Sequence, residues 1–66
     1  MCYGIYDKKS ETLIFSNLPG ETTYAIIGEL LLGSSDKERY EILVLAADNN
    51  YLSVSTGELV IVKRIL

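Results

Sequence analysis

The residue types that most often perform catalysis are sparse in this chain of 66 residues. There is no histidine, so the usual general base near neutral pH is missing and the serines have no histidine partner. Cys2 is the only cysteine, and we interpret it as a small apolar residue because nothing nearby would activate its thiol. Glu38 and Glu41 could transfer protons only inside a cleft, for which so short a chain has little room. These residues predict a protein that is not an enzyme.

Metal and cofactor motifs are also missing. Asp48, Asn49 and Asn50 begin like a calcium-binding loop, but Ser53 and Leu59 stand where that loop needs its glycine and its glutamate. One cysteine without histidine cannot form a zinc site of the usual Cys and His ligands. The glycine-rich motifs that hold phosphates are not present. We therefore expect no catalytic, cofactor-binding or metal-ligating residues and no cofactor.

The charge balance and the longest apolar run limit the possible partners. Nine acidic residues against six basic ones give a net charge of −3, which argues against nucleic acid as a partner. The most apolar window, residues 40–47, is far shorter than the roughly 20 residues that cross a bilayer. The N-terminus lacks the pattern of a signal peptide, and the unpaired Cys2 suits a reducing compartment. We expect a cytoplasmic protein with no membrane partner.

The sequence pattern predicts that most of the chain forms short strands. Alternating apolar and polar residues over 1–6 and 12–16, around a polar break, predict a first hairpin. A second hairpin is expected from residues 51–55 and 58–66. Because all connections are short, we predict a single domain over 1–66: a small antiparallel meander or barrel of five to six short strands.

Residues 22–32 fit either a strand or a helix. As a helix, Tyr24, Ile27 and Leu31 share a face, and Gly33 would end it. The β-branched pairs and the interior Gly28 lower helix propensity, so the strand is preferred. The alternative is an α+β chain with a helix at 21–32.

Residues 36–47 also fit either a helix or a strand. The sequence from Ser35 to Glu38 is a capping box, which would start a helix over 36–47. The β-branched content and the turn that follows favour a strand over 39–47. The helix is kept as the alternative.

Two stretches, 42–45 and 59–62, are apolar on both faces, which means that both faces must be covered. A chain of 66 residues has little left to cover the second face. We therefore expect association with a second copy or with another protein. The candidate interface residues are Leu43, Leu45, Tyr51, Val60 and Val62.

These observations predict a non-enzymatic protein-interaction module that self-associates, or a small regulator or inhibitor of a larger protein. In size and strand order the chain is similar to Sm-like and SH3-like barrels. That resemblance implies an alternative, an oligomeric nucleic-acid-binding barrel that uses tyrosine faces together with Lys63 and Arg64.

Overall fold

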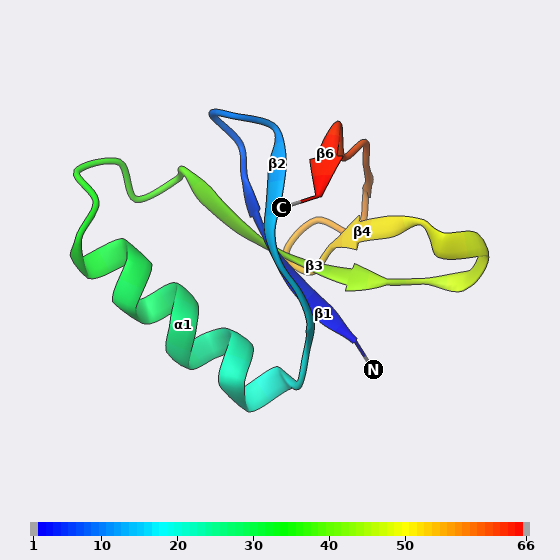
Figure 1. Cartoon of the computed structure of the whole chain (residues 1–66), viewed down its shortest axis with the longest axis horizontal. Helices are drawn as coiled ribbons and strands as arrows, with labels where there is room; N and C mark the ends of the chain where they lie inside the picture. Colours follow the sequence, from blue (N-terminus) through cyan, green and yellow to red (C-terminus); the bar gives the residue numbers. More distant parts are fainter. Residues whose placement is uncertain (1, 66) are drawn as a thin grey trace.

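The computed structural model describes residues 2–65, which form six strands, one α-helix and a short 3₁₀ segment (Figure 1). Met1 and Leu66, the outer ends of the first and last predicted strands, lie outside the described residues. The prediction of a mostly β chain with five to six short strands is confirmed, with one helix added. The elements are β1 (Tyr3–Asp7), β2 (Thr12–Leu18), α1 (Gly20–Leu32), β3 (Tyr40–Leu45), η1 (Ala47–Asn49), β4 (Tyr51–Ser53), β5 (Leu59–Val60) and β6 (Arg64–Ile65).

The strands form one sheet in the order β5-β4-β3-β1-β2-β6, antiparallel except for the β2–β6 pair. In a flat sheet the two edges would lie about 24 Å apart, at about 4.8 Å per strand. Only residues 61–63 join β5 to β6, and the four Cα steps from Val60 to Arg64 span at most about 14 Å. The sheet must therefore curl, and it forms a half-barrel with a concave and a convex face (Figure 1).

The first hairpin is confirmed, and it is irregular. Tyr6 pairs with Leu13, but Ile5 pairs with Phe15, so Ile14 is an extra residue in β2. A second shift lies between Ile5 and Tyr3. Such bulges increase the local twist, which helps the sheet to curl.

The preference for a strand over 22–32 was wrong, and the alternative of a helix at 21–32 is confirmed as α1 (Gly20–Leu32). Pro19 lies in an extended conformation just before the helix, and its carbonyl accepts hydrogen bonds from the Thr23 N–H and Oγ1. Thr23 is fully buried, and α1 packs on β1 and β3 across the convex face. Burial of that face outweighs the weak helix propensity of the segment.

The alternative helix over 36–47 is wrong, and the preferred strand is observed as β3. The capping box forms a local turn, in which Ser34 Oγ donates to the Asp36 carbonyl and the Glu38 N–H donates to Asp36 Oδ1. β3 lies between β1 and β4 near the centre of the sheet, where residues with two apolar faces are expected.

The single strand predicted over 58–66 is interrupted. β4 ends at Ser53, Gly57 takes a positive φ of 75°, and β5 contains only two residues. Residues 61–63 then cross the opening of the half-barrel to β6, where the Lys63 N–H donates to the Glu11 carbonyl. The Tyr6 hydroxyl donates to the Ile61 carbonyl at 3.5 Å, which ties the crossing to the core.

The core on the concave face is small. Tyr6, Leu13 and Leu43 are buried there. Ile5, next to Tyr6 in the chain, lies on the opposite face under α1 and is also fully buried. In the described part of the chain, α1 packs on the convex side only, so closure of the concave side depends on the C-terminal segment.

Candidate protein-interaction surface

The five predicted interface residues come together on the concave face. Register places Leu43, Leu45, Tyr51 and Val60 on one side of the sheet, and Val62 packs against the same cluster. Leu43 is fully buried and is therefore a core residue of this chain. The other four are half-buried, so part of each remains open to solvent.

Three further side chains, which the sequence did not single out, are more exposed. Leu59, Ile61 and Ile65 are 55%, 69% and 66% exposed. They line a pocket of about 310 Å³, together with Asn49 and Asn50 and three of the predicted residues. We call this set the C-terminal apolar surface: Tyr51, Leu59, Val60, Ile61, Val62 and Ile65.

The sequence already indicated this surface, because the segment 59–65 carries apolar residues on both of its faces. Leu59, Ile61 and Ile65 alternate with Val60 and Val62, so one set must point outward when the other packs inward. Sequence alone could not decide which set faces solvent, because both sets are equally apolar.

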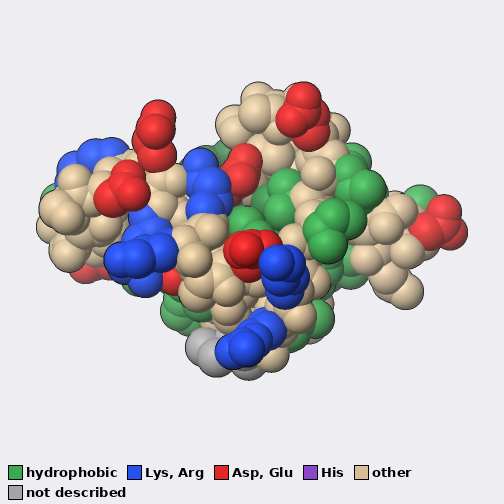
Figure 2. All heavy atoms as spheres, turned by 90° about the horizontal axis from the view of Figure 1, so that it is seen from above, with side chains coloured by type: hydrophobic (Ala, Val, Ile, Leu, Met, Phe, Trp, Pro, Cys, Tyr) green, Lys and Arg blue, Asp and Glu red, His purple; other side chains and the backbone are tan. Residues whose placement is uncertain are grey.

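The surface carries no charged lining residue. Single exposed apolar side chains are common, whereas a contiguous patch marks an interaction site or an aggregation hazard. Figure 2 shows hydrophobic side chains gathered on one side of this face, with Lys, Arg, Asp and Glu around them. The arrangement of an apolar centre and a charged rim is typical of protein interfaces.

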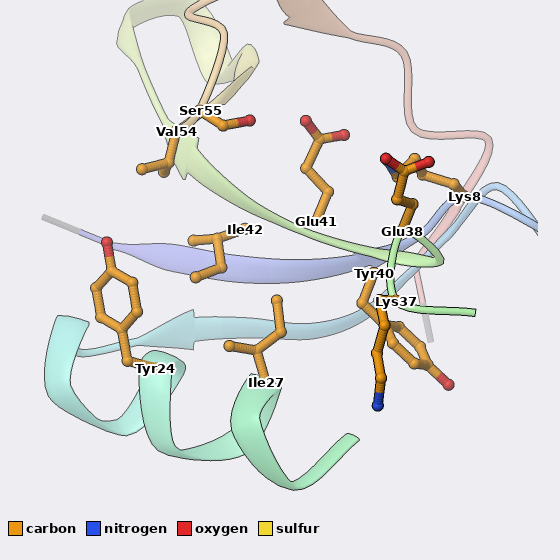
Figure 3. A pocket seen from close by; sticks show the side chains of 10 residues that line it. All are labelled: Lys8, Tyr24, Ile27, Lys37, Glu38, Tyr40, Glu41, Ile42, Val54 and Ser55. Carbon is orange, nitrogen blue, oxygen red and sulfur yellow. The ribbon is translucent and has the colours of Figure 1, made fainter. Parts of the chain in front are cut away.

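A second hollow lies between α1 and the first half of β3 (Figure 3). Its volume is about 500 Å³, and its apolar lining includes Tyr24, Ile27, Ile42 and Val54. Glu41 lines it from β3, and its carboxylate accepts a hydrogen bond from Ser53 Oγ. We call this hollow the α1–β3 groove. From the sequence, Glu41 was expected only as a possible acid–base carboxylate, and no groove was predicted beside it.

Asp7 has the most strongly shifted pKa of the acidic residues described, and its role is structural. Asp7 is 5% exposed and accepts two hydrogen bonds from Arg39, at 3.1 and 2.9 Å. These bonds, assisted by the Lys9 N–H, hold the pKa of the Asp7 carboxyl at about 2, against the desolvation that would raise it. Arg39 also lies over the Tyr40 ring, 5.3 Å from its centre. This network fixes the start of β3 against the end of β1.

Burial raises the pKa of Tyr6, whose hydroxyl is engaged with the Ile61 carbonyl. Cys2 is exposed and has no disulfide partner. Within residues 2–65, no group of three Cys, Asp or Glu side chains could hold a metal ion. Over the same residues, no helix is long and apolar enough to cross a membrane.

In comparisons with protein-family models, curated proteins and solved structures, none matches this chain.

Proposed function

We propose that this chain is a non-enzymatic protein-interaction module that associates with a second copy of itself through the C-terminal apolar surface. The observation that carries the proposal is the set of three neighbouring side chains, Leu59, Ile61 and Ile65, each more than half exposed around an apolar pocket. A role as a small regulator or inhibitor of a larger protein would use the same surface.

A second copy fits because the surface contains both a pocket and protruding side chains. An isologous dimer needs one patch that is complementary to itself, and Ile61 of one copy could enter the pocket of the other. The uncharged lining also lets two chains of net charge −3 approach without placing like charges in contact.

The expected affinity is modest. Burying the exposed parts of Leu59, Ile61 and Ile65 contributes roughly 3–6 kcal/mol per copy, from about 1.5–3 kcal/mol for each full burial. Association costs about 4–15 kcal/mol. At the favourable limit, two copies gain about 12 kcal/mol against a cost of about 4 kcal/mol, so the dissociation constant is no tighter than about 1 µM.

Nothing in the described residues favours the alternative of a nucleic-acid-binding barrel. Lys63 forms an ion pair with Glu11 at 3.1 Å, and the basic residues do not outnumber the acidic ones. Nucleic-acid affinity depends on unpaired cations facing phosphates, so these charges disfavour that function.

The test is the molecular mass in solution, measured by analytical ultracentrifugation over a range of protein concentrations. The wild-type chain should shift from monomer to dimer as its concentration rises toward the millimolar range. Ile61→Lys should remain monomeric, because it places a charge at the centre of the apolar surface.

Leu32→Lys is the matched control. Leu32 is 81% exposed, but it lies at the end of α1 and outside the C-terminal apolar surface. It should dimerise like the wild type. A wild-type chain that stays monomeric at every concentration, or a Leu32→Lys variant that loses association as Ile61→Lys does, would refute the proposal.

A further inference from the structure

The strand β3 has one edge that its neighbours leave half open. On one side it pairs with β1 along residues 40–44, but on the other side β4 pairs only with residues 43–45. The last bond on that side runs from the Val54 N–H to the Ile42 carbonyl. The chain then turns away, so no strand of residues 2–65 lies on that side of Tyr40 and Glu41.

The backbone of Tyr40 faces this open side. The Lys8 N–H donates to the Arg39 carbonyl, and the Leu45 N–H donates to the Cys2 carbonyl. Odd-numbered residues of β3 therefore bond to β1, and even-numbered residues point to the opposite edge. The N–H and C=O of Tyr40 are oriented to pair with an added strand.

The α1–β3 groove lies along this edge. Tyr40, Glu41 and Ile42 all line it, although successive residues of a strand point to opposite faces. A single hollow can contact all three only if it wraps around the edge of the strand. Figure 3 shows Glu41 and Ile42 pointing to different sides of β3.

The two sides of the groove differ in chemistry. On the α1 side, Tyr24 and Ile27 face Ile42 (Figure 3). On the other side, Glu41 is oriented by Ser53, and neither Glu41 nor Glu38 takes part in an ion pair among the described residues.

Two lysines also line the charged end of the groove. The Lys37 ammonium donates to the Leu31 carbonyl at 2.6 Å, at the end of α1, and Lys8 lines the groove as well. Of these charged side chains, Glu41 is the one that a hydrogen bond from Ser53 Oγ holds next to Tyr40. A carboxylate held beside the open edge, in a chain of net charge −3, favours a basic side chain at the matching position of a partner.

We infer that the α1–β3 groove binds an extended peptide segment with alternating apolar and basic side chains, which adds as a strand beside Tyr40. Alternate side chains of the added strand reach opposite faces. The apolar ones then pack on Ile27 and Ile42, and the basic ones face Glu41. This inference does not depend on the C-terminal apolar surface.

The probe is an acetylated, amidated hexapeptide of alternating Val and Lys, titrated into the ¹⁵N-labelled chain and followed by NMR. The amide signals of Tyr40, Ile42 and Ile27 should shift together and saturate at a peptide concentration of about 1 mM, as expected for a short edge. Glu41→Gln should weaken binding at least threefold. Glu29→Gln, which removes an exposed carboxylate of α1 that does not line the groove, should leave it unchanged.

Two further peptides test whether binding uses backbone hydrogen bonds to Tyr40 and whether it needs basic side chains. A version with alternate backbone nitrogens methylated on the pairing edge cannot donate to the Tyr40 carbonyl and should not bind. A version with Glu in place of Lys should bind at least tenfold more weakly. Equal binding of either peptide, or no shift at Tyr40 with the Val–Lys peptide at 5 mM, would overturn the inference.

Discussion

At the scale of single residues, the contrast between the two ion pairs shows how burial decides what a charge contributes. The Asp7–Arg39 pair has one partner almost fully buried and two hydrogen bonds. The Lys63–Glu11 pair has side chains that are 66% and 46% exposed, and such pairs contribute little.

The first prediction concerns pH. The folded-state pKa of Asp7, about 2, lies below its ordinary value of 3.8, so its contribution to stability is complete above pH 3.8 and is lost as the pH falls toward 2. Asp7→Asn should cost about 2 kcal/mol at pH 6 and much less at pH 2, measured by urea unfolding. Lys63→Gln should cost under about 1 kcal/mol. The same cost for Asp7→Asn at both pH values would contradict this assignment.

At the scale of elements, the irregular hairpin depends on the absence of one side chain. A Cβ on Gly4 would lie 2.7 Å from the Phe15 carbonyl oxygen and 2.8 Å from Leu13 Cδ1. The bulged β2 therefore approaches β1 as closely as it does because position 4 is glycine. Gly28, in the interior of α1, has no atom within 4 Å of its Cβ position.

Replacing each of these two glycines with alanine should change the free energy of unfolding in opposite directions. Gly4→Ala should lower the free energy of unfolding by about 1–3 kcal/mol, because backbone must move to admit the methyl group. Gly28→Ala should raise it by about 0.5–1 kcal/mol through helix propensity. Urea unfolding of both variants is the measurement, and a Gly4→Ala chain as stable as the wild type would refute the close approach.

At the scale of the whole molecule, the chain covers one face of its sheet and leaves the other incomplete. Its accessible surface is 4527 Å², slightly more than the roughly 4,200 Å² expected for a compact monomer of 7.3 kDa. The helix covers the convex face, and residues 61–63 only partly close the concave one. A partner that covers the C-terminal apolar surface would add to a core with few fully buried apolar residues.

The last prediction follows from mass action. If a second copy binds the folded chain, the midpoint of thermal unfolding should rise with protein concentration. Scanning calorimetry should show a rise of several degrees between 10 µM and 1 mM for the wild type, and none for Ile61→Lys. A midpoint that does not depend on concentration in the wild type would count against self-association.

The amino-acid sequence by itself determined the mostly β class, the first hairpin and the strand β3, because period-2 alternation and apolar runs are local features. Only the tertiary structure decided that 20–32 is a helix, since weak local propensity is overruled by the need to cover the convex face. It also decided the break at 61–63 and which apolar set of that segment faces solvent. Those outcomes depend on how far the sheet curls, and curl arises from pairings between residues distant in the chain.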